Sequence, residues 1–123
     1  YRIIILWGPD EIKDVEKIVS LMKTTVIIAP QTDLHKAAAL ISRCRLLICN
    51  DGGINHISVA VEIPSLAIFG NTSPEVWSPA SEFPDHHHIY NPEFIYNEND
   101  NSFGISPEDV YNKVIKIIDT NNK

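Results

Sequence analysis

The chain has 123 residues, of which 44% are hydrophobic and 21% charged, with 10 Lys and Arg against 16 Asp and Glu. The length is that of one domain, and the composition is too apolar for a disordered chain. The net charge of −6 argues against a nucleic-acid-binding protein, which needs a basic face. The longest apolar runs, such as Ile3 to Trp7, are far shorter than the roughly 20 residues that cross a bilayer. We therefore expect neither a membrane span nor a signal peptide.

The first third of the chain alternates two apolar runs with two helical patterns. Arg2 to Trp7 and Val26 to Ala29 are apolar, largely β-branched runs that end near a proline, which is typical of strands buried on both faces of a parallel sheet. We expect a helix capped by Asp10 after the first run. After the second run, either Thr32 or Asp33 is placed to cap another helix.

The middle of the chain continues this alternation. Leu46 to Cys49 predicts a third strand, Ile54 to Val61 a helix, and Ser65 to Phe69 a fourth strand. Strands separated by helices of about ten residues indicate right-handed βαβ crossovers. The predicted fold class is therefore α/β, with a doubly wound, Rossmann-like parallel sheet.

The last third is less regular. Residues 71–106 carry four prolines among Asn, Asp and His, and predict a loop with a short helix at Pro74 to Trp77. We interpret His86-His87-His88 as part of a solvated loop, because three consecutive histidines cannot all face one metal ion. Asn91 to Ser102 is expected to be a solvated excursion. Ser106-Pro107-Glu108-Asp109 predicts the start of a final helix, with a cap, a proline and an acid in the favoured order.

The loop after the third strand carries the strongest signal for ligand binding, because open α/β sheets bind ligands beyond the carboxyl ends of their strands. Gly52 and Gly53 let the backbone approach a ligand, and the following helix directs free N–H groups outward. No Lys or Arg occurs from residue 46 to 112, so backbone amides would have to bind a phosphate there. His56 shares the helix face of the glycines and could reach the same anion.

These residues also have purely structural interpretations. The two glycines could only make a tight turn, Asp51 could only cap the helix, and His56 could only fill a gap in the core. The loop matches neither G-x-G-x-x-G nor G-x-x-x-x-G-K-S/T, which disfavours Rossmann dehydrogenases and P-loop NTPases. Cys44 and Cys49 are poorly spaced for a metal site or a disulfide, so we expect buried free thiols in a reducing compartment.

The segment from Leu46 to Pro74, LLICNDGGINHISVAVEIPSLAIFGNTSP, resembles the signature region of glycosyltransferase family 9, the ADP-heptose:lipopolysaccharide heptosyltransferases and their relatives. That pattern runs as an apolar strand, Asp-Ser/Thr-Gly-x-x-His, Gly-x-Pro, a strand ending in Phe/Tyr-Gly, and Pro-Thr-Asp/Ser-Pro. The chain departs from it at Gly52, where the family usually has Ser or Thr, and at Asn71, which replaces a proline. The matching positions are Asp51, Gly53, His56, Ala60, Pro64, Phe69, Gly70, Thr72 and Pro74.

The resemblance implies the C-terminal half of a GT-B glycosyltransferase. Residues 1–123 would form a single nucleotide-sugar-binding domain, a fragment that lacks its first strand and helix and the N-terminal acceptor domain. The implied site residues are Asp51, Gly52, Gly53 and His56 for the donor diphosphate, and Gly8, Glu11 and Thr32 for the nucleoside.

The implied reaction is an inverting transfer of a heptose-like sugar from a nucleoside-diphosphate donor to lipopolysaccharide or a related glycan. The resemblance also implies a cytoplasmic location, with the protein either free or peripheral at the inner membrane face. The family's catalytic carboxylate belongs to the N-terminal domain, so this chain alone is expected to be inactive, and no metal or other cofactor is expected. The alternative is a non-catalytic α/β module that binds a ligand or a protein.

Overall fold

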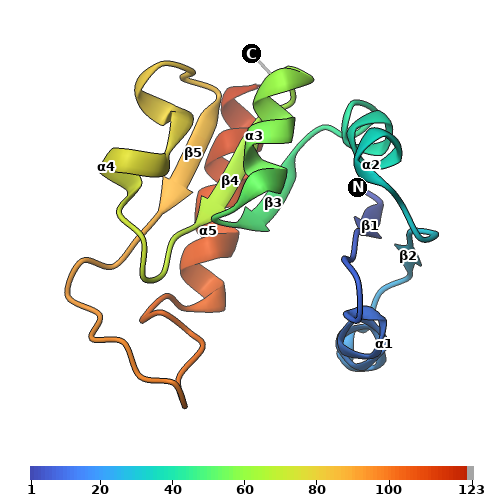
Figure 1. The fold of residues 1–123 in the computed structure, drawn as a ribbon, viewed down its shortest axis with the longest axis horizontal. Helices are drawn as coiled ribbons and strands as arrows, with labels where there is room; N and C mark the ends of the chain where they lie inside the picture. Colours follow the sequence, from blue (N-terminus) through green and yellow to red (C-terminus); the bar gives the residue numbers. More distant parts are fainter. Residues whose placement is uncertain (122–123) are drawn as a thin grey trace. The chain divides into compact units, whose positions relative to one another are not determined.

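The computed structural model describes residues 1–121, which divide into two compact units, Tyr1–Leu40 and a second unit that begins at Ile41. In each unit parallel strands alternate with helices (Figure 1). The predicted α/β class with parallel strands is therefore confirmed. The described strands form two sheets, one in each unit.

The first unit contains a two-stranded parallel sheet. Strand β1 (Ile3–Ile5) pairs with β2 (Val26–Ile28), and helix α1 (Ile12–Leu21) connects them. Helix α2 (Leu34–Ile41) follows β2. Because the last residues of β1 and β2 pair in register, the loops that follow the two strands leave the same edge of the sheet.

The faces of this small sheet are more open than predicted. Ile3, Ile27 and Ile28 are exposed by 43, 46 and 37%, whereas their apolar runs predicted strands buried on both faces. Two strands have too few neighbours to cover both of their faces within the unit. Burial is concentrated instead at Val15 of α1, at Ala29, which follows β2, and at Ala37 of α2.

Of the helix caps predicted in this unit, one is wrong and one is confirmed. Asp10 adopts the left-handed conformation with φ 66°, and the N-cap of α1 is Glu11, so the prediction that Asp10 caps this helix is wrong. Glu11 turns back instead, and its carboxylate accepts the Gly8 N–H at 2.6 Å. For α2, the Lys36 N–H donates to Asp33 at 2.8 Å, which confirms Asp33 as the cap.

The second unit is built on a three-stranded parallel sheet. Its strands β3 (Leu47–Asn50), β4 (Ser65–Ile68) and β5 (His86–Ile89) lie in the order β3-β4-β5. Helix α3 (Gly53–Ala60) covers one face and α5 (Pro107–Thr120) the other (Figure 1). The central strand β4 is buried on both faces, as its apolar run predicts.

The segments after β4 contain one confirmed helix and one unpredicted strand. Helix α4 (Pro74–Trp77) lies where it was expected and precedes a 3-10 turn, η1 (Pro79–Ser81). The prediction of a solvated loop at the three histidines is wrong, because they form most of β5, with His86 only 5% exposed. The sequence pattern missed this strand because histidines lack the apolar signature of a buried strand. His86 is held in the interior by a hydrogen bond rather than by hydrophobicity.

Helix α5 begins as its sequence predicts. The Ser106 hydroxyl oxygen accepts the Asp109 N–H, and the Asp109 carboxylate accepts the Ser106 N–H. This reciprocal pair satisfies two amide groups that the helix itself leaves unpaired. Pro107 occupies the first turn, where the missing N–H has no cost.

Candidate functional site

The loop between β3 and α3 is fixed at its first residue by the neighbouring strand. The Asp51 N–H donates to the Ile68 carbonyl at 2.9 Å, which extends the pairing between β3 and β4 by one residue. Gly52 is the N-cap of α3, and its carbonyl accepts the Asn55 N–H at 3.1 Å. The loop thus turns into the helix directly at the carboxyl edge of the sheet.

The amides at the start of α3 are unpaired. The N–H groups of Gly52, Gly53 and Ile54 make no hydrogen bond within residues 1–121. A Cβ on either glycine would meet nothing within 4 Å, and the extended backbone of Gly52 (φ 160°, ψ −175°) does not demand a glycine. Neither packing nor turn geometry therefore explains the pair, and three donors at the positive end of a helix lack a partner among the described residues.

Asp51 does not act as the helix cap. The helix has no side-chain cap, and the Asp51 carboxylate accepts a hydrogen bond from the Thr72 hydroxyl at 2.5 Å. The interpretation of Asp51 as a cap is therefore wrong.

Burial, and secondarily the charge of Asp51, raise the pKa of the neighbouring Cys49 thiol to about 12, so this half-buried, free thiol stays protonated.

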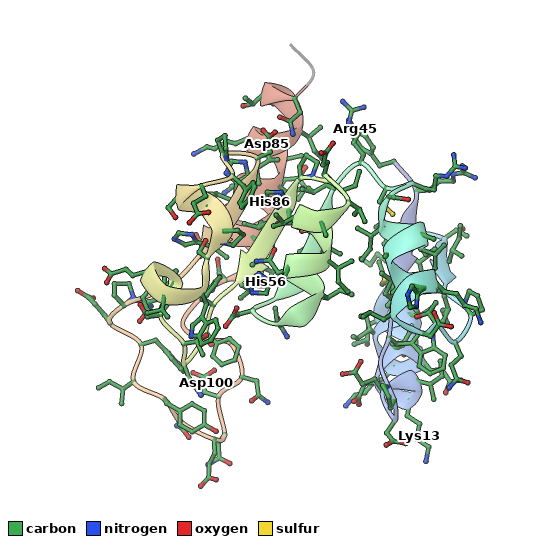
Figure 2. The ribbon with its side chains drawn as sticks, turned by 45° about the horizontal axis from the view of Figure 1, so that its top comes forward. Lys13, Arg45, His56, Asp85, His86 and Asp100 are labelled. Atoms are coloured by element: carbon green, nitrogen blue, oxygen red, sulfur yellow. The ribbon has the colours of Figure 1, made fainter. Side chains whose placement is uncertain are left out.

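His56 lies on α3, one turn after Gly53, and its side chain is exposed (Figure 2). It has no hydrogen-bond partner in the part of the chain that the structure describes. The interpretation of His56 as a core histidine is wrong, because the adjacent Asn55 faces the interior instead, with 0% exposure. His56 therefore remains available to a ligand at the start of the helix.

A buried polar cluster beneath α3 was not predicted. The Ser65 hydroxyl donates to Asn55 Oδ1 at 2.7 Å, and the Ser58 hydroxyl donates to the Asn55 carbonyl at 2.6 Å. Since both hydroxyl protons are used, Nδ1 of His86 is the donor to Ser65, at 2.9 Å. Asn55 Nδ2 is left without a partner. The cluster connects the first turn of α3 to β4 and β5.

This environment predicts a pH-dependent stability. Burial lowers the pKa of His86 below its ordinary value of 6.5, against the opposing charge of Asp85. Burial, and secondarily the Lys113 ammonium, lower the pKa of His87 and of His88. The unfolded chain therefore binds more protons than the fold at mildly acidic pH. We expect the free energy of unfolding to be fully retained above about pH 6.5 and to fall as the pH drops below it.

Urea unfolding between about pH 5 and pH 8 measures this effect. The variant His86→Gln, which cannot titrate in this range, is expected to have a shallower decline than the unmodified protein. An equal decline in both proteins would show that His86 does not contribute.

Comparison with known proteins shows the family of the chain. Residues 1–93 match the family described as glycosyltransferase family 9 (heptosyltransferase). The chain belongs to glycosyltransferase family 9. A Cβ at Gly52, where the family pattern given above has Ser or Thr, would meet no atom within 4 Å.

Curated relatives of this family 9 chain are heptosyltransferases. The lipooligosaccharide heptosyltransferase 2 of Haemophilus influenzae is 39% identical over 62 residues, which are 50% of this chain and 18% of the relative. The lipopolysaccharide heptosyltransferase 3 of Escherichia coli K12 is 31% identical over 86 residues, which are 67% of this chain and 25% of the relative. The matches therefore span about a quarter or less of these relatives. No solved structure matches the chain significantly.

The nucleoside candidates of this family 9 chain lie in its first unit. Gly8 and Glu11 form the turn between β1 and α1, where the Gly8 N–H is already bonded to Glu11. Thr32 lies in the loop between β2 and α2 and is half-buried. These two loops leave the same edge of the β1–β2 sheet.

Among residues 1–121, none of the helices has the length and apolar composition of a membrane-spanning helix.

The segment that follows β5 packs against Gly70, which lies just after β4. Phe103 packs on Gly70, where a Cβ would lie only 2.5 Å from its ring, and Phe94 meets Phe103 edge to face. The Asn91 side chain donates to the Gly104 carbonyl at 3.2 Å. The excursion is thus anchored at its base, whereas residues 95–102 are exposed, as predicted for a solvated segment. Gly70 is required for this close approach, a contact that only the tertiary structure reveals.

Proposed function

We propose that this chain is the donor-binding domain of a glycosyltransferase that transfers a heptose-like sugar from a nucleoside diphosphate to lipopolysaccharide or a related glycan. Membership of family 9 and the names of the curated relatives support this function. The observation that carries it is the group of unpaired amides at the start of α3, which faces open space at two glycines. A diphosphate is the anion that the donor would present there.

The amides would stabilise the departing diphosphate. The N–H groups of Gly52, Gly53 and Ile54 are held by the helix, so they need no reorganisation when negative charge develops on the leaving group. The positive end of the α3 dipole acts in the same direction. His56 would approach from the next turn as a further donor. This arrangement would supply what cationic side chains supply elsewhere, since residues 46–112 contain no Lys or Arg.

The sugar transfer would be an inverting displacement. A carboxylate outside this chain would take the proton of the acceptor hydroxyl, whose oxygen attacks the anomeric carbon as the nucleoside diphosphate leaves. The chain would therefore not catalyse transfer alone. We propose an N-terminal acceptor domain as its partner in the complete protein, and a peripheral location at the cytoplasmic face of the inner membrane.

The first unit would contact the nucleoside. Glu11 Oε2 accepts the Gly8 N–H, which orients the carboxylate and leaves its other oxygen to accept a hydrogen bond from a ribose hydroxyl. Thr32 would add a hydroxyl from the parallel loop. The exposed isoleucines of the β1–β2 sheet also fit a further strand and helix of a larger domain, because parallel sheets are normally covered on both faces.

Calorimetric titration of the complete protein with ADP, GDP and UDP tests this proposal. Binding of one of the three, together with sugar transfer from the matching donor, is the expected result. A folded protein that binds none of them would contradict the proposed function and would favour a non-catalytic binding module.

A further inference from the structure

The loops after β3 and β4 are joined by two hydrogen bonds. Asn50 and Ile68 pair in register, so both loops leave the sheet side by side. The Asp51 N–H donates to the Ile68 carbonyl, and the Thr72 hydroxyl donates to Asp51 Oδ2. The second of these bonds determines where the carboxylate lies.

Asp51 has an alternative position that would block the site. An aspartate close to the start of a helix normally accepts hydrogen bonds from the first-turn N–H groups, because these donors are unpaired and the helix dipole attracts negative charge. In this structure the carboxylate is bonded to Thr72, and the amides of Gly53 and Ile54 stay free. A carboxylate bonded to those amides would occupy the donors that a diphosphate needs and would repel it.

No cation of the same segment holds Asp51 in place. Residues 46–112 contain no Lys or Arg, and Asp51 forms no ion pair among the described residues. The Thr72 hydroxyl is thus the group that holds the carboxylate away from the helix. We propose that Thr72 is a positioning residue, which keeps Asp51 from capping α3 and so keeps the amides open to the donor diphosphate. This inference rests on the proposed function.

The variant Thr72→Val tests the inference in the complete protein, with whichever of ADP, GDP or UDP the unmodified protein binds. Valine keeps the shape of threonine but lacks the hydroxyl, so Asp51 is released toward the amides. We expect calorimetry to show about tenfold weaker binding, a factor that corresponds to roughly 1.4 kcal/mol. Thr72 is exposed, so the urea midpoint should stay unchanged. Thr72→Ser, which keeps the hydroxyl, should bind as the unmodified protein does.

Two further variants separate a positioning role from a general effect. Ser73→Ala removes a neighbouring exposed hydroxyl that makes no hydrogen bond within residues 1–121, and it should leave binding unchanged. In an Asp51→Ala background, Thr72→Val should have no additional effect, because no carboxylate remains to occupy the amides.

The outcomes distinguish this inference from the proposed function. Unchanged binding in Thr72→Val, or an equal loss in the Asp51→Ala background, would overturn the positioning role while the proposed function stands. If Gly53→Val also leaves binding unchanged, or if the unmodified protein binds no nucleoside diphosphate, the proposed function itself is overturned.

Discussion

Gly53→Val is expected to weaken nucleoside diphosphate binding by about 100-fold or more, as measured by calorimetry on the complete protein. The valine side chain would fill the open space at the Gly53 Cβ position, where the proposed ligand would approach the amides. Loss of two hydrogen bonds to a charged group, each worth roughly 1.5 kcal/mol, accounts for this factor. The fold should survive, because a Cβ at this position would meet no atom within 4 Å.

Ala60→Val is the matched control for this variant. Ala60 is an exposed residue at the other end of the same helix, so the substitution places the same β-branched side chain away from the amides. It should leave the affinity unchanged. If both variants bind equally well, the amides at the start of α3 are not the diphosphate site.

Asn55→Ala is expected to lower the free energy of unfolding by about 2–3 kcal/mol. Asn55 is completely buried, and its side-chain oxygen accepts the Ser65 hydroxyl. The substitution removes this acceptor, leaves Ser65 with an unpaired buried proton, and opens a small cavity. Urea unfolding monitored by circular dichroism measures the change.

An exposed asparagine on a helix provides the comparison for this second variant. Asn112 lies on α5 with its side chain in solvent, and Asn112→Ala should change the stability by less than about 0.5 kcal/mol. An equally small effect for Asn55→Ala would mean that the buried cluster does not anchor α3.

The sequence correctly predicted the elements that are determined by residues close together in the chain. Ser106 to Asp109 contains the complete capping pattern of α5, and the apolar run at β4 matches a central strand buried on both faces. The two glycines marked the loop before α3 because a helix start after a strand has a recognisable sequence. These features depend on neighbours within a few positions of the chain.

The features that were missed depend on residues distant in sequence. His86 is buried because Ser65, 21 positions away, accepts its Nδ1 proton, and no periodic pattern signals such a pair. Thr72 reaches Asp51 across the same 21 positions, which overturned the interpretation of Asp51 as a cap. A buried polar residue follows no hydrophobic period, so its partners have to be found in three dimensions.

The central claim is that the free amides at the start of α3 bind a diphosphate, and nuclear magnetic resonance on the complete protein labelled with 15N-glycine tests it most directly. On titration with ADP, GDP or UDP, the amide signals of Gly52 and Gly53 should shift strongly, as expected for new hydrogen bonds to phosphate, while that of Gly104 should stay in place. Binding of a nucleoside diphosphate without any shift at Gly52 and Gly53 would contradict the account.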